Sequence, residues 1–389
     1  MRLKLNYVWL DGTSPEPKLR SKIKVENLKH PQILTEYPIW SFDGSSTNQA
    51  QGSSSDCYLK PVKLYYPEKI SELSTIYVLC EVLDKDDKPH STNDRAILGK
   101  EDENFWVGFE QEYFIRSSKN GLILGFDKGT FVEPQGIYYC GVGGQMVGRN
   151  VSNLHLNKCL EYGIDIQGTN AEVAIGQWEY QLFSKGKISA ADDLIMSRYF
   201  LYEIAEEFGY DIELHPKPII GEWNGSGLHT NFSNEKMRTQ GGEEYFKAIF
   251  NIFEARADKH IEVYGSDNHK RLTGRFETQA IDKFSWGISD RGASIRVPKN
   301  VGKTWKGYLE DRRPAANANP YKVINVIYES LMLTETLERT LHNMYDDVSV
   351  NLDEIKKNSA FNRSILSNEE LLKEYMTDDT EEINVDLTK

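Results

Sequence analysis

The sequence predicts a mixed α/β (α+β) fold, in which a β-rich first part is followed by strands and helices together. Before about residue 100, apolar residues alternate with polar ones over short runs that end in turn residues. Beyond that point, one alternating run precedes long segments with apolar residues at helical spacing. The chain of 389 residues is long enough for two domains.

Two strands are expected in the first part. Residues 7–10 form an apolar run that leads into an Asp-Gly turn, and Ile76, Val78, Cys80 and Val82 alternate on one face of a second run. Residues 41–55, rich in Ser, Gly, Asn and Gln, are typical of a solvated loop. Turn residues at 89–94 mark a connection. We therefore expect domains at residues 1–100 and 101–345, followed by an acidic extension at residues 346–389.

The run from Phe105 to Ile115 is expected to be a strand with two unlike faces. One face is apolar, and the other presents Trp106, Glu110 and Glu112. Neighbouring carboxylates repel each other and are costly to bury, so they indicate a bound cation or solvent. A solvated edge strand is the alternative interpretation.

Three helices are predicted from the helical spacing of apolar residues and from the residues that typically begin or end a helix. They are expected at residues 192–208, 243–264 and 321–342, where the first two stop at glycine and the third begins after Asn-Pro. We expect their apolar stripes to be core. In the acidic extension, residues 367–376 have the pattern of a short amphipathic helix, and a solvated terminus is the alternative.

Charge and cysteine usage exclude several classes. A net charge of −13 argues against general binding to nucleic acids or acidic membranes. No run of 18 apolar residues and no leader-like beginning is present. The four cysteines have no Cys-x-x-Cys spacing, so free thiols in a reducing cytoplasm are the expected state. A catalytic Cys140–histidine pair is a minor alternative.

Six possible metal ligands occur along the chain, and five of them are carboxylates. They are Glu110, Glu112, Glu172, Glu179, His229 and Glu310. Such a set suits hard divalent cations such as Mg²⁺ or Mn²⁺. Arginines lie among and after them, although no complete Walker A loop is present. Metal ions together with arginines indicate phosphoryl transfer to or from an anionic substrate.

Several of these segments together resemble those of type II glutamine synthetase, in the same order. They are Phe42-Asp43-Gly-Ser-Ser-Thr47, Glu110-Gln-Glu112-Tyr113, Asn170-Ala-Glu172-Val173, Gln177-Trp-Glu179-Tyr-Gln181, Asn224-Gly-Ser-Gly-Leu-His229-Thr-Asn231 and Asp290-Arg291-Gly-Ala-Ser-Ile-Arg296-Val-Pro298. Any one of them is a weak signal, but an ordered set from about Tyr7 to Leu341 is specific.

The resemblance implies an N-terminal β-grasp-like domain and a C-terminal catalytic domain of curved antiparallel sheet with helices. It implies ATP-dependent ligation of ammonia to the γ-carboxylate of L-glutamate through γ-glutamyl phosphate, giving L-glutamine, ADP and phosphate. It also implies a homo-oligomer, a decamer of two stacked pentamers, with active sites between subunits. Ligation of another amine and a catalytically dead paralogue are the rival interpretations.

By the same resemblance, two or more Mg²⁺ or Mn²⁺ ions bind in each site. Glu112, Glu172 and Glu179 are expected to hold one ion. Glu110, His229 and Glu310 are expected to hold the second. For ATP, the matching positions are Arg291 and Arg296 at the phosphates, with Trp106, Asn231, Ser233 and Tyr308 along the nucleotide.

The remaining matches concern glutamate and ammonium. Asn224, Gly225, Arg271, Arg291 and Arg312 are expected to bind glutamate. Asp43 is the expected base for ammonium, with Glu277 and Tyr138 around the cation, and the Asp43 loop is expected to complete the site of a neighbouring subunit. The chain departs from the family at Phe276, which stands where a histidine is usual.

Overall fold

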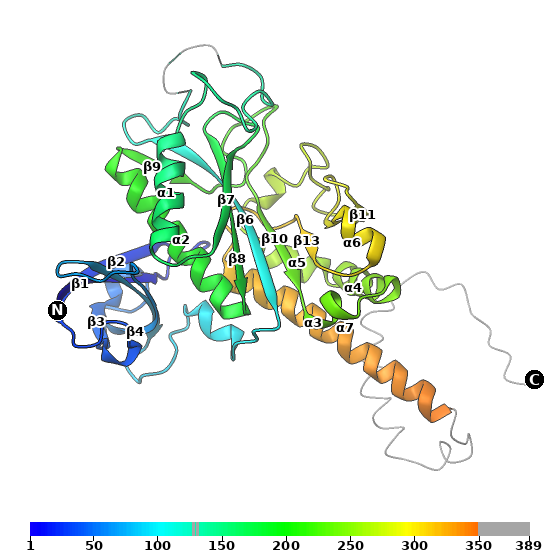
Figure 1. The fold of residues 1–389 in the computed structure, drawn as a ribbon, viewed down its shortest axis with the longest axis horizontal. Helices are drawn as coiled ribbons and strands as arrows, with labels where there is room; N and C mark the ends of the chain where they lie inside the picture. Colours follow the sequence, from blue (N-terminus) through cyan, green and yellow to red (C-terminus); the bar gives the residue numbers. More distant parts are fainter. Residues whose placement is uncertain (127–128, 130–131, 349–389) are drawn as a thin grey trace, which may run out of the picture.

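The computed structural model describes residues 1–126, 129 and 132–348, and this part forms two β-sheets with helices around the second (Figure 1). The acidic extension lies outside the described residues from 349 onward, together with its expected helix. Among the described helices, none has the length and apolar content needed to cross a membrane.

The N-terminal sheet has five strands in the order β2-β1-β5-β4-β3, with β1 and β5 parallel at its centre. The strands are β1 Arg2–Leu10, β2 Leu19–Asn27, β3 Trp40–Asp43, β4 Asp56–Tyr65 and β5 Thr75–Leu83. Both expected runs lie in strands. The expectation of a solvated loop at 41–55 is wrong at its start, because β3 pairs with β4 there and the composition of the segment does not reveal that partner.

Strand β5 is buried on both faces. The four alternating residues of the expected apolar face pack in the core of the N-terminal sheet, as predicted. On the other face, Tyr77 packs edge-on against Phe200 with ring centroids 4.8 Å apart and donates a hydrogen bond to Glu203 at 2.9 Å. Both partners belong to helix α2 (Lys187–Glu207), so this face attaches the first sheet to the second domain.

The second sheet has eight strands along the order β11-β12-β13-β10-β6-β8-β7, with β9 paired to one end of β6. All pairs are antiparallel except β11 with β12. The strands are β6 Trp106–Ser117, β7 Ile166–Ala171, β8 Gln177–Lys185, β9 Tyr210–Glu213, β10 Leu228–Ser233, β11 Trp286–Ile288, β12 Ile295–Val297 and β13 Leu309–Asp311.

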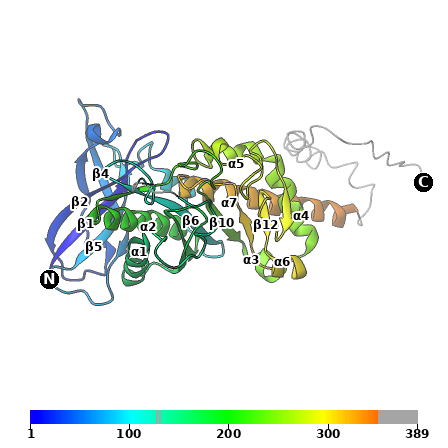
Figure 2. The same ribbon diagram turned by 90° about the horizontal axis from the view of Figure 1, so that it is seen from above.

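Seven α-helices are described, with four short 3₁₀ turns. The other helices are α1 Arg149–Glu161, α3 Glu235–Thr239, α4 Glu243–Ala255, α5 Ala257–Val263, α6 Lys299–Thr304 and α7 Pro320–Val348. The 3₁₀ turns are η1 Leu34–Glu36, η2 Gly44–Thr47, η3 Asp94–Leu98 and η4 Asn268–Lys270. Viewed from above, the N-terminal sheet lies at one end of the molecule and α7 runs toward the other (Figure 2).

All three expected helices differ from the prediction, and α7 differs at its end, which lies at Val348 instead of residue 342. The expected helix at 243–264 is wrong as a single element, because the backbone leaves helical geometry at Arg256 (φ −105°, ψ 15°) and divides it into α4 and α5. Helix α2 begins earlier than expected, at Lys187. The carboxylate of Glu101 accepts hydrogen bonds from the backbone N–H of Ile188 (2.9 Å) and Ser189 (2.8 Å), which supplies a cap from a residue distant in sequence.

The start of α7 is as predicted. The Asn319 side chain accepts a hydrogen bond from the backbone N–H of Tyr321 at 3.1 Å, and Pro320 is the first helical residue.

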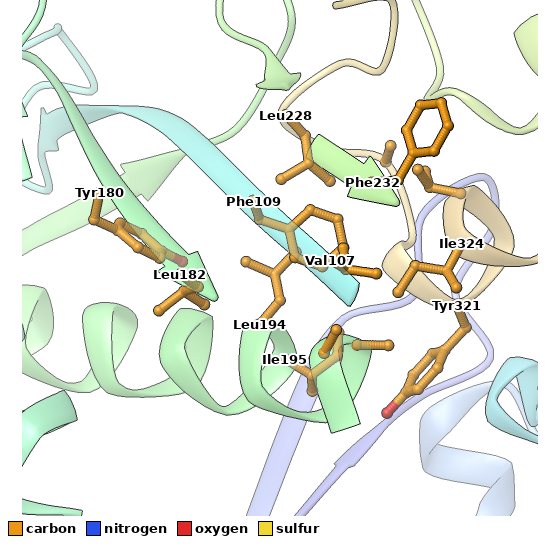
Figure 3. Packing of buried hydrophobic residues seen from close by; sticks show 14 of the residues in the cluster. Val107, Phe109, Tyr180, Leu182, Leu194, Ile195, Leu228, Phe232, Tyr321 and Ile324 are labelled. Atoms are coloured by element: carbon orange, nitrogen blue, oxygen red, sulfur yellow. The ribbon is translucent and has the colours of Figure 1, made fainter. Parts of the chain in front are cut away.

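The core lies between one face of the second sheet and helices α2 and α7. Val107, Phe109 and Phe232 from the sheet pack toward Leu194 of α2 and Ile324 of α7 (Figure 3). All five are at most 1% exposed. Because side chains alternate along a strand, this packing leaves the opposite face of β6 and β10 available for polar residues.

Candidate active site

The strand register places the charged residues beside one another across the second sheet. The aligned pairs are Glu112 with Glu179, Glu110 with His229, Asn231 with Glu310, and Arg296 with Glu310. Opposite residues on antiparallel strands have Cβ atoms about 4.5–5.5 Å apart. Strands β8, β6, β10, β13 and β12 thereby assemble one polar cluster from segments far apart in the sequence.

Two compact groups of ligand atoms lie in this cluster, which we call the carboxylate cluster. Within each group the ligand atoms lie no more than 4.8 Å apart, and the groups are Glu110, His229 and Glu310, and Glu112, Glu179 and His229. The first group has the same members as the second predicted ion site. Its imidazole Nδ1 lies 3.3 Å from Glu110 Oε2 and 3.8 Å from Glu310 Oε1.

His229 is neutral. Burial, and after it the Arg312 guanidinium, holds the pKa of His229 well below its usual range, so these short contacts are not ion pairs. Arg271 Nη2 lies 3.1 Å from His229 Nε2, which therefore accepts a hydrogen bond. A neutral imidazole is the form that ligates metal ions, but here its proton is on Nδ1 and faces Glu110, so an ion bound at Nδ1 would require that proton to move to Nε2 and Arg271 Nη2 to shift.

Glu172 lies beside the cluster but outside both compact groups. It follows the end of β7, and its carboxylate accepts hydrogen bonds from Asn170 Nδ2 at 3.0 Å and from the backbone N–H of Val173 at 3.1 Å. Its charge interacts with that of Glu112. Its assignment to the first ion stays a prediction.

Burial makes three of the carboxylates hard to ionise without a cation. It raises the pKa of Glu112 to about 7, that of Glu172 to about 8 and that of Glu179 to about 9. Repulsion from Glu112 adds to the shift at both Glu172 and Glu179. A bound cation would stabilise the ionised carboxylates, and hard divalent cations such as Mg²⁺ and Mn²⁺ prefer oxygen ligands of this kind.

A pH-dependent effect of metal ions on stability is expected. Because these folded-state pKa values lie above the ordinary value of 4.5, metal-free protein should lose stability as the pH rises from about 4.5 through about 9. Mg²⁺ should oppose this loss by binding the ionised, folded form, raising the melting temperature by several degrees more at about pH 8.5 than at about pH 6. Thermal unfolding in EDTA and in Mg²⁺ measures this difference. Glu179→Gln should reduce it, and an equal Mg²⁺ effect at both pH values would contradict the expectation.

Arginines surround the carboxylate cluster, and two of them, Arg271 and Arg312, are buried. Arg312 Nη1 lies 2.6 Å from Glu310 Oε1, and Arg296 Nε lies 2.8 Å from Glu310 Oε2 without hydrogen-bond geometry. Arg271 also donates to the backbone carbonyl of Arg312 at 3.0 Å. Glu310 thus neutralises two of the guanidinium groups that we predicted to bind anionic substrates. Arg291 is exposed, and its carbonyl accepts a hydrogen bond from Arg312 Nε at 3.0 Å.

Gly227 allows the cluster to pack closely. A Cβ atom there would lie 2.4 Å from Arg271 Nη2 and 3.0 Å from His229 Nε2. The backbone N–H of Gly227 also donates a 2.5 Å hydrogen bond to Glu112 Oε2. Glycine therefore makes room at this position for the protein's own side chains.

The expected glutamate-binding turn is held by two glutamines that the sequence did not single out. Gln135 Oε1 accepts from the backbone N–H of Asn224 at 2.6 Å, and Gln135 Nε2 donates to Asn224 Oδ1 at 2.8 Å. Gln177 Nε2 donates to the carbonyl of Gly225 at 2.9 Å. Gln135 lies 89 residues from Asn224 in sequence, so no local pattern could reveal this contact.

The expected nucleotide positions lie along the same strands. Asn231 Nδ2 donates to Glu110 Oε1 at 2.9 Å, and half-exposed Tyr308 is close enough to Glu110 for that carboxylate to help raise the pKa of its hydroxyl, after burial. Trp106 lies opposite Ser233 in the register. Arg238, which we did not predict, lies 3.9 Å from the Trp106 ring and donates to Ser233 Oγ at 3.0 Å.

The predicted ammonium-binding residues do not all lie together: Glu277 lies beside the carboxylate cluster, whereas Asp43 lies on the N-terminal sheet. The Glu277 carboxylate interacts electrostatically with Glu172 and so lies beside the cluster. Tyr138 is buried, and its hydroxyl donates to the carbonyl of Glu133 at 3.3 Å.

Asp43 lies on the N-terminal sheet, at the end of β3. Its exposed carboxylate accepts hydrogen bonds from the backbone N–H of Ser45 (3.0 Å), from Ser45 Oγ (2.6 Å) and from Ser46 Oγ (2.7 Å), which lower its pKa. In Figure 1, β3 and β4 lie at the side of the molecule, apart from β10 and β13. One chain therefore does not bring Asp43 to the carboxylate cluster.

Comparison with known proteins agrees with the resemblance. Residues 3–85 match the family described as Glutamine synthetase, beta-Grasp domain, and residues 92–247 match Glutamine synthetase, catalytic domain. The glutamine synthetase of Bradyrhizobium diazoefficiens is 47% identical over 346 residues, covering 87% of this chain and 99% of the relative. That of Saccharomyces cerevisiae is 44% identical over 336 residues, covering 85% and 89%.

A solved structure supports the fold. The cryo-EM structure of Plasmodium falciparum glutamine synthetase superposes with a TM-score of 0.67 at 18% identity, covering 85% of this chain and 72% of that one. With family matches in both sheets and relatives aligned over most of their length, the chain belongs to the glutamine synthetase family, the enzymes that form glutamine from glutamate and ammonia with ATP and a divalent metal ion.

Proposed function

We propose that the carboxylate cluster binds two divalent cations, Mg²⁺ or Mn²⁺, while this chain ligates ammonia to L-glutamate. The observation that carries the proposal is the juxtaposition, on one sheet face, of two compact ligand groups, in one of which the buried carboxylates Glu112 and Glu179 have raised pKa values. When bound, the cations supply charge stabilisation for the phosphoryl group that moves from ATP. Glu172 is included as a ligand because it lies beside Glu112.

In the first half-reaction, this chain's residues orient the two anionic substrates. Asn224 and Gly225 hold glutamate on the turn fixed by Gln135 and Gln177, with Arg271 and Arg312 at the edge of the cluster. Arg291 and Arg296 bind phosphate oxygens. The strand positions of Trp106, Asn231 and Ser233 hold the nucleotide, together with Tyr308 directly before β13. The γ-carboxylate oxygen then attacks the terminal phosphorus, giving γ-glutamyl phosphate and ADP.

In the second half-reaction, ammonium must lose a proton before it can attack. Asp43 accepts that proton. Its serine hydrogen bonds keep it ionised, which is the form that attracts ammonium. Glu277 and Tyr138 complete the cation subsite. Ammonia forms the new C–N bond as phosphate leaves the same carbon.

We infer that Asp43 acts in the site of a neighbouring copy of this chain. Its hydrogen bonds lie within its own loop, and its strand is apart from the cluster. A decamer of two stacked pentamers is the arrangement that the resemblance implies.

All four cysteines are free, which favours a reducing compartment, the cytoplasm, as the location of the protein.

Product analysis tests the proposed reaction. Purified protein with ATP, Mg²⁺ and glutamate should convert ammonium to glutamine, releasing one phosphate for each amide formed. Methylamine and putrescine should be poor nucleophiles under the same conditions. Efficient amide formation with either amine, and none with ammonium, would overturn the choice of nucleophile.

A further inference from the structure

The loop that carries Glu277 has an unusual backbone. An isolated bridge between Thr273 and Ala280 closes it. Within it, Phe276 (φ 57°) and Glu277 (φ 60°) are consecutive non-glycine residues in the left-handed region. Such conformations are strained and persist only where the surroundings fix them. The contacts that fix this pair therefore also fix the direction of the Glu277 carboxylate.

On one side, two cations contact the Phe276 ring. Lys217 Nζ lies 4.7 Å from the ring centroid, and the guanidinium carbon of Arg275 lies 4.8 Å from it. Arg275 is also ion-paired with Glu222. Both distances are within the range of cation–π attraction, which is of the same order as the strain of a left-handed residue.

Lys217 is itself held in place. Its ammonium donates to the carbonyl of Gly221 at 3.2 Å and to that of Trp223. These residues immediately precede Asn224, the expected glutamate contact. Segment 217–223 thus joins the glutamate turn to the Phe276 ring.

On the other side, the loop is bonded to the arginines of the cluster. Thr278 Oγ1 donates to the carbonyls of Arg275 at 2.8 Å and Arg271 at 3.1 Å. Arg312 Nη2 donates to the Glu277 carbonyl at 3.5 Å. The Glu277 carbonyl is thus held by Arg312, and the ring of the preceding Phe276 is held by the cations. The exposed Glu277 side chain lies toward Glu172, with which its carboxylate interacts electrostatically.

We propose that Phe276 and Lys217 are positioning residues for the ammonium step. The cation–π contact between their side chains holds Glu277 beside the carboxylate cluster. This inference rests on the proposed function only in taking Glu277 as part of the ammonium subsite. Release of the loop would weaken ammonium binding and admit water. Water attack on γ-glutamyl phosphate breaks the same C–O bond as ammonia attack, but it returns glutamate and phosphate.

The test uses full-length Phe276→Leu and Lys217→Met, with Phe276→Tyr and Lys217→Arg as conservative variants. In the first two, KM for ammonium should rise about tenfold, the effect of losing one such contact, while KM for ATP changes less than about twofold. Phosphate released per glutamine should rise above one. The conservative variants should retain wild-type ratios, as should Lys247→Met on the outside of α4.

Three outcomes are decisive. An unchanged ammonium KM and phosphate ratio in both Phe276→Leu and Lys217→Met would overturn the proposal. So would a parallel loss in every kinetic constant with a lower melting temperature, because that indicates a structural role alone. A wild-type protein that forms no glutamine would instead overturn the proposed function.

Discussion

Glu112→Ala and Glu310→Ala are each expected to abolish glutamine formation, lowering kcat by at least about 10³-fold. The two carboxylates belong to different compact groups, so each change removes a ligand from a different proposed cation. Glutamine formation at saturating Mg²⁺ measures the loss. Rates within a few-fold of wild type for either variant would contradict the ligand assignment.

The two variants are expected to differ in stability. Loss of Glu112 removes one member of a repelling set, whereas loss of Glu310 leaves Arg296 and Arg312 without their shared counterion. Glu310→Gln, which preserves shape, is therefore the companion variant, and circular dichroism should show both proteins folded. Exposed Glu244 on α4 supplies the matched control, since Glu244→Ala should keep wild-type turnover.

Activity is expected to return when two inactive variants share an oligomer. Asp43→Ala and Arg312→Ala should each be inactive, because one removes the ammonium base and the other a buried arginine of the cluster. If Asp43 serves a neighbouring subunit, dissociation and reassembly of the mixture will place both lesions in some sites and neither in others. In a random equal mixture, about a quarter of the composite sites should carry neither lesion, so the activity should recover to at most about a quarter of the wild-type value.

Tagged subunits and mass spectrometry establish that mixed oligomers have formed. Each variant reassembled alone is the control and should stay inactive. Verified mixed oligomers without activity would show that Asp43 serves the active site of its own chain, or that the active sites are not built between subunits.

The sequence predicted the parts of the site that depend on strand alternation. Glu110 and Glu112 share one face of β6 because strand side chains alternate, and the buried Phe109 confirms the opposite face. The pairing of β6 with β8 and β10 comes from long-range register, which local patterns do not contain. The family resemblance supplied those partners instead.

Other features depended on contacts between distant segments. The Glu101 cap of α2 and the Gln135 clamp on Asn224 each join residues more than 80 positions apart. The left-handed backbone at Phe276 and Glu277 was also hidden, since neither residue type favours it and the surrounding cations compensate for it. The close approach of Arg271 to Gly227 likewise joins distant segments, so no local pattern could reveal it.

Counting bound Mn²⁺ tests the central claim most directly, because it examines the carboxylate cluster independently of turnover. Equilibrium dialysis with detection of free Mn²⁺ by electron paramagnetic resonance gives the number of ions per chain. Wild-type protein should bind two ions, and Glu112→Gln and Glu310→Gln should each bind one with near-native affinity. If both variants bind as many ions as the wild type, the carboxylate cluster does not hold the two cations.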